Sequence, residues 1–581
     1  MWRWPSTRRS PRATGTGRGS CLPSLPGPRS GYGDGASELC RAPTRDTVAR
    51  VSARERTWWG WGWRDEALSN VECVELASLV PGLPESPIPV PEVAELQLPP
   101  SRIRPPTSLE HLCSADPEAR AAHTYGQAYR DVMRALHRRL DHPPDLVAFP
   151  RTEFDVVELL DWAMSNGYAV IPYGGGTSVV GGVEYRDRGH SAVISLDTSA
   201  LDRVLEIDPV SRAARIQGGA FGPELEDQLR PHGYTLRHFP QSFEFSTLGG
   251  WLATRAGGHY ATLHTHIDDF VQSMRVVTPS GTGESWRLPA SGAGPSPDRL
   301  FLGSEGALGV ITEAWMRIQD RPQYTASTSV MFGEFDRALR AVRAIAQSGL
   351  HPSNCRLLDP AEAQLSSASD GSASVLVLGC ESAHYPVDDT LAAAVALATE
   401  HGGTPHPAGG TGRQSSDGED GDAAVRSWRS AFLRMPYLRD GLARMSAIVE
   451  TFETACTWNA ALPLYEAVRS QLGAAIRDVT GADGLITCRL THVYPDGPAP
   501  YFTVIAAGRR GSEVAMWDEI KAAAGDILHA HRATITHHHA VGRDHRRWYD
   551  RQRPEPFASA LRSAKHALDP RGVLNPGVLI D

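Results

Sequence analysis

The sequence predicts an α+β protein in which one ligand-binding domain precedes a second α+β domain. From about Pro144 onward, short apolar runs alternate with amphipathic stretches of helical period. Loops rich in glycine and hydroxyl residues recur within this region. The chain has 581 residues, which is enough for about two to four domains with large cores.

Composition excludes several classes of protein. Apolar residues make up 41% of the chain and charged residues 22%, as in an ordinary globular protein. The net charge of −9 argues against affinity for nucleic acids. No apolar run approaches the ~20 residues that span a bilayer. The eight cysteines are scattered without a C-x-x-C pair, so we expect the cytoplasm or a reducing organelle lumen rather than secretion.

Residues 1–52 differ in composition from the rest of the chain. They are rich in Arg, Ser, Gly and Pro, and their first acidic residue is Asp34. Such a leader resembles an organelle transit peptide but lacks the apolar segment of a secretory signal. We favour a disordered extension, or upstream sequence included by too early a start, with the natural product beginning near Val48 or Val51.

Residues 53–143 are expected to form a helical and irregular N-terminal segment. The indoles between Trp58 and Trp63 need burial or a partner. A proline-rich connector over 81–106 predicts little regular structure. After Asp116-Pro117, an apolar stripe predicts one helix over 116–140.

The domain over 144–320 is expected to combine strands and helices. Apolar runs predict strands over 146–149, 168–171, 192–196, 203–207 and 213–217. Periodic apolar residues predict helices over 153–166 and 221–232. These elements indicate mixed sheets.

The strand over 168–171 leads directly into three consecutive glycines, Gly174, Gly175 and Gly176. Glycine has no Cβ and can take φ > 0, so successive N–H groups can converge on one anion. Thr177 and Ser178 add hydroxyl donors. The pattern is neither G-x-G-x-x-G nor G-x-x-x-x-G-K-[ST]. We interpret it as a grip for a diphosphate, with a tight turn that holds no ligand as the alternative.

Three further loops, over 239–250, 253–258 and 303–312, are also hydroxylic and glycine-rich. Four such loops within about 140 residues indicate a backbone surface that contacts one long ligand. In order and spacing they resemble the FAD-binding domain of the vanillyl-alcohol oxidase and p-cresol methylhydroxylase (PCMH) superfamily. The resemblance implies that noncovalent FAD lies between two α+β subdomains, since no residue matches a covalent attachment site. The FAD contacts that it implies are Pro172, Tyr173, Gly174, Gly175, Gly176, Thr177, Ser178, Gln241, Ser242, Thr247, Gly250, Thr254, Gly257, Glu305, Gly306, Gly309, Val310 and Ile311.

Residues 321–530 are expected to form an α+β cap, which in this superfamily covers the flavin and selects the substrate. The pattern predicts helices over 335–347, 389–401 and 514–531, and strands over 373–380, 485–490 and 501–506. The last two strands are expected to pair across a turn at 495–497. Residues 407–424 predict a mobile loop. Residues 531–581 are expected to return to the FAD-binding domain.

Several short segments resemble one branch of the superfamily, the alkyldihydroxyacetonephosphate (alkylglycerone-phosphate) synthases. They include 356–359, 437–440, 450–454, 487–491 and 537–542. The resemblance implies a transferase that exchanges the acyl chain of acyl-dihydroxyacetone phosphate for a fatty alcohol through a flavin N5 adduct, giving an ether-lipid precursor. It also implies a homodimer and a peripheral membrane contact. Gln241 departs from the pattern, because animal members carry Asp there. An FAD-dependent oxidoreductase of a 2-hydroxy acid, related to D-lactate and 2-hydroxyglutarate dehydrogenases, is the alternative.

Three adjacent histidines, His537, His538 and His539, need hydrogen-bond partners if they are buried. On a strand, His537 and His539 would share one face and His538 would point to the other. Because the sequence shows no companion ligand cluster, we expect proton transfer or phosphate binding rather than a metal site.

The resemblance also assigns two arginines and a tyrosine. It places Arg356 and Arg439 at the substrate phosphate, where the guanidinium fork suits the ligand. A structural arginine–carboxylate pair is the alternative for each. It makes Tyr501 the general acid/base, with a pKa lowered from ~10 by a nearby cation. A buried core tyrosine is the alternative.

Overall fold

The computed structural model describes residues 54–264, 266–406 and 423–581, with side chains of 423–431 excepted. The expected extension over 1–52 lies outside the described residues. So does the expected mobile loop over 407–424, apart from the two residues that open helix α13 (Ala423–Arg444).

The first sheet of the FAD-binding region carries the three-glycine loop. Its four strands lie in the order β1 (Cys113–Ser114), β2 (Leu146–Ala148), β4 (Val193–Asp197) and β3 (Ala169–Tyr173). Strands β2, β4 and β3 are parallel, so the chain crosses between them through helix α4 (Glu153–Asn166). A capping box at Thr152 starts α4, and left-handed Gly167 ends it. The glycine loop follows β3 directly, as predicted.

The second sheet is antiparallel throughout its five strands. Their order is β5 (Val204–Asp208), β6 (Ala213–Gln217), β10 (Val310–Arg317), β8 (Val271–Thr278) and β9 (Gly281–Glu284). Helices α5 (Gly222–Leu229) and α6 (Leu248–Thr254) share an apolar core with this sheet. The helix predicted over 221–232 finishes as a 3-10 turn over Arg230–His232, where Pro231 has no N–H to continue it.

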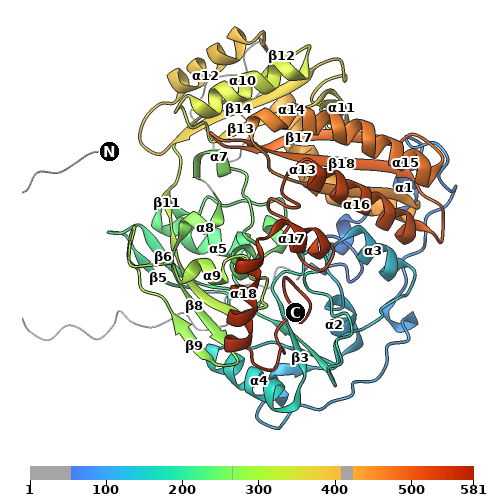
Figure 1. Cartoon of the computed structure of the whole chain (residues 1–581), viewed down its shortest axis with the longest axis vertical. Coiled ribbons are helices and arrows are strands. Elements are labelled where there is room, and N and C mark those ends of the chain that lie inside the picture. Colours follow the sequence, from blue (N-terminus) through green and yellow to red (C-terminus); the bar gives the residue numbers. More distant parts are fainter. Residues whose placement is uncertain (1–53, 265, 407–422) are drawn as a thin grey trace, which may run out of the picture. The chain divides into compact units, whose positions relative to one another are not determined.

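The cap contains a seven-stranded antiparallel sheet (Figure 1). The strand order is β15 (Thr404–Pro405), β12 (Tyr324–Phe332), β14 (Ser374–Ser382), β13 (Asn354–Leu358), β17 (Leu485–Val493), β18 (Pro498–Ala507) and β16 (Ala447–Glu453). Its apolar core side chains pack against helices that include α10 (Phe335–Gln347), α12 (Asp388–Glu400), α14 (Trp458–Ala467) and α16 (Glu513–Ala530).

Side chains along the cap strands point alternately to the two faces of the sheet, so one face packs on the core and the other lines the site. Cys488 and Leu490 of β17 are core residues, whereas Arg489 and Thr491 line a cavity. Helix α13 lines the same cavity through Arg439 and other residues. The predicted hairpin of β17 and β18 is confirmed, and it places Arg489 directly opposite Tyr501.

After helices α17 (Arg546–Gln552) and α18 (Glu555–Leu568), the C-terminal segment runs close to β3 (Figure 1). Leu574 forms a parallel bridge with Val170 of β3. The Asn575 side-chain amide donates to the Gly182 carbonyl at 2.9 Å and to the Glu305 carbonyl at 2.7 Å. The end of the chain therefore ties two of the predicted FAD loops together.

The single helix predicted over 116–140 is wrong. The structure has two helices, α2 (Pro117–Ala122) and α3 (Tyr129–Leu136), separated by a turn around Gly126. A Cβ at Gly126 would overlap the Ser178 carbonyl oxygen, and Gln127 N donates to that oxygen at 2.6 Å. The helix breaks because this turn must pack on the glycine loop. The proline-rich stretch over 81–106 contains one 3-10 turn, Val93–Glu95, and follows helix α1 (Asn70–Ala77).

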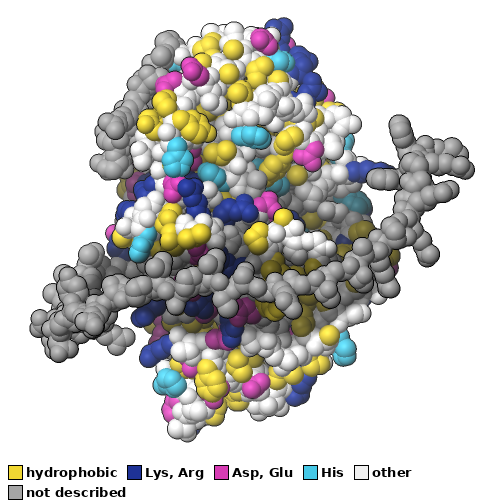
Figure 2. Space-filling model, turned by 90° about the vertical axis from the view of Figure 1, so that its left-hand side faces the viewer, with side chains coloured by type: hydrophobic (Ala, Val, Ile, Leu, Met, Phe, Trp, Pro, Cys, Tyr) yellow, Lys and Arg dark blue, Asp and Glu magenta, His cyan; other side chains and the backbone are white. Residues whose placement is uncertain are grey.

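Three further features concern the helices, the surface and the cysteines. Every helix among the described residues is too short or too polar to cross a bilayer. On the face in Figure 2, basic side chains are interspersed with acidic and hydrophobic ones. The six cysteines of the described region are free thiols.

Candidate functional site

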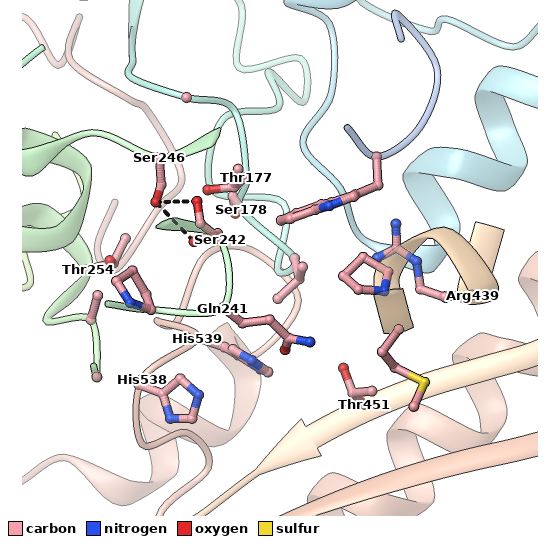
Figure 3. Close-up of a pocket in the computed structure, with 18 of the residues that line it drawn as sticks. Thr177, Ser178, Gln241, Ser242, Ser246, Thr254, Arg439, Thr451, His538 and His539 are labelled. Atoms are coloured by element: carbon pink, nitrogen blue, oxygen red, sulfur yellow. Dashed lines mark hydrogen bonds between the residues drawn. The ribbon is translucent and has the colours of Figure 1, made fainter. Parts of the chain in front are cut away.

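A cavity of about 460 Å³ is lined by the glycine-rich loops and by the cap (Figure 3). Every FAD contact predicted from the sequence lines it, from Pro172 to Ile311. So do Arg356, Arg439, Tyr501, His538 and His539, whereas His537 does not. Four loops and two domains that are distant in sequence therefore converge on one space.

The three glycines are needed for close approach more than for unusual backbone angles. A Cβ at Gly174 would overlap Thr247 Oγ1, and one at Gly175 would overlap the Phe245 carbonyl oxygen. Among the three, Gly176 has a positive φ, of 71°. The first glycine loop thus packs directly against the loop that holds Ser246 and Thr247. The absence of side chains at the three glycines leaves a concave backbone surface, the glycine cradle, which larger residues would fill.

Hydroxyl groups line this cradle (Figure 3). Ser178 Oγ accepts from Gly182 N at 2.9 Å, and Thr254 Oγ1 donates to the Gly250 carbonyl at 2.9 Å. Ser242 Oγ donates to Ser246 Oγ at 3.0 Å. A hydroxyl that makes one local hydrogen bond keeps further capacity for a ligand. A glycine cradle bordered by hydroxyls fits the diphosphate of FAD.

Gln241 and Glu305 make contacts that the sequence did not predict. The Gln241 side-chain amide donates to the Phe432 carbonyl at 2.7 Å and so links an FAD loop to α13. The Glu305 carboxylate accepts from Val541 N at 2.9 Å and Gly542 N at 2.8 Å. It therefore holds the segment after the three histidines. Burial raises the pKa of Glu305 to about 7, although both backbone donors oppose the rise.

Glu305 predicts a measurable pH dependence of stability. Its pKa in the folded protein exceeds the ordinary 4.5, so the folded state binds the proton more tightly than the unfolded state does. The contribution of Glu305 to stability therefore falls as pH rises from 4.5 to 7. We expect the thermal midpoint to drop across this window by about 2–4 °C more in the unmodified protein than in Glu305→Gln. If the thermal midpoint fell equally with pH in the two proteins, the raised pKa of Glu305 would be contradicted.

Tyr501 lies in the middle of a row of three side chains that crosses three strands. Glu453 of β16 and Arg489 of β17 are its direct neighbours in register. The Arg489 guanidinium carbon lies 3.9 Å from the centre of the Tyr501 ring. Burial raises the pKa of Tyr501, and Arg489 offsets this only in part. The expected lowering of this pKa is therefore wrong, and at neutral pH the phenol carries its proton.

The buried carboxylate of Glu453 organises the three histidines. It accepts hydrogen bonds from the backbone N–H groups of His537, His538 and His539, the last two at 3.0 and 2.7 Å. Residues 537–539 consequently form bends and not a strand, and His538 and His539 both reach the cavity (Figure 3). The expectation of alternating faces is wrong, because a long-range carboxylate sets this backbone.

Burial disfavours the charged form of all three imidazoles. Burial lowers the pKa of His537 to about 4 and also lowers the pKa values of His538 and His539. His537 lies behind His538, with Nδ1 3.0 Å from His538 Nδ1 and Nε2 3.0 Å from the Tyr494 hydroxyl. It supports His538 from outside the cavity.

The histidines have companions that sequence reasoning missed. Ligand atoms of His492, His537 and His538 lie within 4.8 Å of one another, and so do those of Glu453, His538 and His539. His492 Nε2 lies 2.9 Å from the Gly258 carbonyl oxygen. The Glu453 oxygens already accept several hydrogen bonds from the backbone of this segment. Proton transfer by the histidines stays a prediction.

The two predicted substrate arginines have different surroundings. Arg356 is buried on β13, and its guanidinium carbon lies 5.4 Å from the Phe432 ring centre. Arg439 on α13 donates through Nε to Asp440 at 2.8 Å and through Nη1 to the Gln127 carbonyl at 2.6 Å. Asp440 in turn accepts from Trp61 N at 2.6 Å. These contacts favour a structural arginine–carboxylate pair for Arg439. Together with Asp440, it connects α13 to the segment around Trp61 and to the turn at Gln127.

The cavity also has an apolar arm. Its lining includes Leu76, Leu79 and Val80 near α1, Leu438 and Leu442 of α13, and Val449, Leu485 and Ile505 of the cap sheet. Leu79 is 76% exposed and Leu485 is 40% exposed, so this arm reaches the surface. An aliphatic chain would bury its surface there at low desolvation cost.

Comparisons with known proteins agree with this arrangement. Residues 144–285 match the FAD binding domain, and residues 321–579 match the C-terminal domain of FAD linked oxidases. The alkyldihydroxyacetonephosphate synthase of Trypanosoma brucei brucei is 30% identical over 485 residues, covering 80% of this chain and 78% of the relative.

Solved structures extend the likeness to the fold. A structure of alkyldihydroxyacetonephosphate synthase superposes with a TM-score of 0.75 at 26% identity, covering 90% of this chain and 98% of that chain. p-Cresol methylhydroxylase, at 14% identity, superposes with a TM-score of 0.59 over 81% of this chain and 94% of its own. The predicted PCMH-type fold is confirmed, and FAD is the cofactor that the domains and the glycine cradle support. The chain belongs to the alkyldihydroxyacetonephosphate synthase family of FAD-binding proteins.

Proposed function

We propose that this protein exchanges the acyl chain of acyl-dihydroxyacetone phosphate for a fatty alcohol and so forms an ether-lipid precursor. The observation that carries the proposal is the two-sided cavity. One side presents the FAD loops, Tyr501 and two histidines, and the other presents an apolar arm that reaches the surface. Membership in the synthase family supports the same reaction.

The residues of the cavity divide the work of such an exchange. Arg356 binds the phosphate, for which a buried guanidinium is suited. Tyr501 is protonated at neutral pH and acts as the acid. His538 and His539 line the same cavity and are the proton acceptors; burial opposes their protonation, and the carboxylate of Glu453 beside them favours it. FAD, held noncovalently by the glycine-rich loops, would supply a nucleophilic flavin nitrogen. Cap residues cover the part of the cavity that holds Tyr501, which limits the access of water to the reacting groups.

The apolar arm fits the alkyl chain of the alcohol. Leu79 lines this arm and is exposed, and Val71 and Val74 are exposed on the neighbouring helix α1. These side chains support a peripheral contact with a lipid surface.

A homodimer rests on the family resemblance alone and is tested by the mass in solution. The free thiols support a reducing compartment.

The decisive experiment incubates the purified flavoprotein with palmitoyl-dihydroxyacetone phosphate and labelled hexadecanol. We expect label in alkyl-dihydroxyacetone phosphate, release of palmitate and no consumption of an electron acceptor. The alternative, oxidation of a 2-hydroxy acid, predicts stoichiometric bleaching of the flavin by that acid. Bleaching without labelled ether product would overturn the transferase.

Glu453→Gln tests the organisation of the histidines. Glutamine keeps the shape but has one acceptor oxygen, so it cannot hold all the backbone N–H groups that Glu453 binds. We expect kcat for the exchange to fall about tenfold or more, with flavin content retained. The exposed Glu110→Gln is the matched control and should not change kcat. Unchanged turnover of Glu453→Gln would remove this carboxylate from the site.

A further inference from the structure

We propose that Arg489 and Arg356 together form an oxyanion-binding subsite beside Tyr501. The subsite deepens the proposed function, because that function determines which oxyanion occupies it. The family resemblance implies a phosphate contact for Arg356 but no role for Arg489. Strand register, burial and the hydrogen bonds of Arg489 bring the second arginine into the site.

Strand register places the two guanidiniums on one face of the cap sheet. Strands β13 and β17 are antiparallel, with Leu358 opposite Arg489. Arg356 precedes Leu358 by two residues and therefore projects from the same face as Arg489. Both guanidinium carbons face the Phe432 ring, at 5.4 Å from Arg356 and 5.7 Å from Arg489. Both residues line the cavity, although they are only 1% and 3% exposed.

Arg489 retains a buried donor for a ligand. Its Nη1 donates to Glu362 at 2.8 Å, and the other oxygen of Glu362 accepts from the Thr487 hydroxyl. Its Nε has no hydrogen-bond partner among the described residues. A buried N–H without an acceptor destabilises the folded protein, and an ionised oxygen is the strongest acceptor available. An oxyanion in the cavity would satisfy this donor.

The two cations also influence each other directly. Burial lowers the pKa of Arg356 to about 9, and the neighbouring charge of Arg489 contributes to the shift. An anion between or beside them would relieve this repulsion. Arg439 lacks this setting, because its guanidinium contacts Asp440 and the Gln127 carbonyl. Arg489, and not Arg439, is therefore the second arginine of the oxyanion-binding subsite.

The oxyanion has two possible sources in the proposed reaction. It is either the phosphate of the substrate or the carboxylate that leaves when the acyl chain is exchanged. Both present oxygens that a guanidinium can bind. Since Arg489 lies against the Tyr501 ring, either anion would lie next to the proposed proton donor.

Calorimetric titration of the FAD-bound protein tests the subsite without requiring turnover. Inorganic phosphate and hexanoate are titrated separately. Removing Arg489 alone would leave Glu362 buried without its cation, so the main variant combines Arg489→Met with Glu362→Gln. Arg489→Lys keeps the charge and loses the fork. Arg562→Lys, on the surface of α18, is the control.

We expect at least one anion to bind the unmodified protein saturably. Its Kd should rise roughly 10- to 100-fold in the double variant, less in Arg489→Lys, and not at all in Arg562→Lys. Loss confined to phosphate would assign the subsite to the substrate phosphate, and loss confined to hexanoate to the leaving carboxylate. Absence of saturable binding, or an unchanged Kd in a flavin-loaded double variant, would overturn the subsite. Absence of ether product would instead overturn the proposed function.

Discussion

Gly175→Val should give colourless protein without FAD. A Cβ at this position would overlap the Phe245 carbonyl oxygen and lie 2.8 Å from Ser246 Cα. Both neighbours are backbone atoms of the adjoining FAD loop, so no side-chain rotation can relieve the overlap. The two loops must separate, and the cradle for the diphosphate opens with them. We expect flavin absorbance per protein to fall at least about tenfold, which a loss of only ~1.4 kcal/mol in binding would produce at limiting FAD.

A matched glycine separates this effect from general sensitivity to valine. Gly283 lies in exposed strand β9, where a Cβ would meet no heavy atom within 4 Å. Gly283→Val should therefore retain full flavin. A Gly175→Val protein that purifies yellow at full occupancy would show that the loop does not hold the cofactor.

Local signals in the sequence were sufficient for most of the regular elements. Helices α4 and α10 run over the predicted 153–166 and 335–347, because their apolar periodicity coincides with real burial. The break at Gly126 had no comparable local signal. It exists because Gln127 must donate to Ser178, a contact across about fifty residues of chain.

The site shows the same division between local and long-range information. Four glycine-rich loops identified the cofactor surface, since backbone approach leaves a mark in composition. Arg489 could have been found in part, because a hairpin with its turn over 495–497 puts residues 489 and 501 on the same face. Their direct pairing depends on a β-bulge between Leu490 and His492 that had no local signal. Glu453 could not, because pairing of β16 with β18 and the bends at 537–539 depend on contacts between distant segments.

Tyr501→Phe should lower kcat for the exchange by ~10²–10⁴ with little change in KM. The substitution removes one hydroxyl and keeps the ring that packs between Arg489 and His538. Since burial keeps the phenol protonated, the lost group is a proton donor and not a phenolate. Steady-state kinetics with palmitoyl-dihydroxyacetone phosphate, alongside the flavin spectrum, would measure the effect.

The exposed Tyr385→Phe serves as the matched control, because its side chain is 63% exposed and lies outside the cavity lining. It should leave kcat and KM unchanged. Tyr501→Phe should retain the flavin spectrum, which excludes unfolding as the cause of a lower kcat. If Tyr501→Phe turned over at the unmodified rate, Tyr501 would be a packing residue beneath Arg489, and the proton would have to come from His538 or His539.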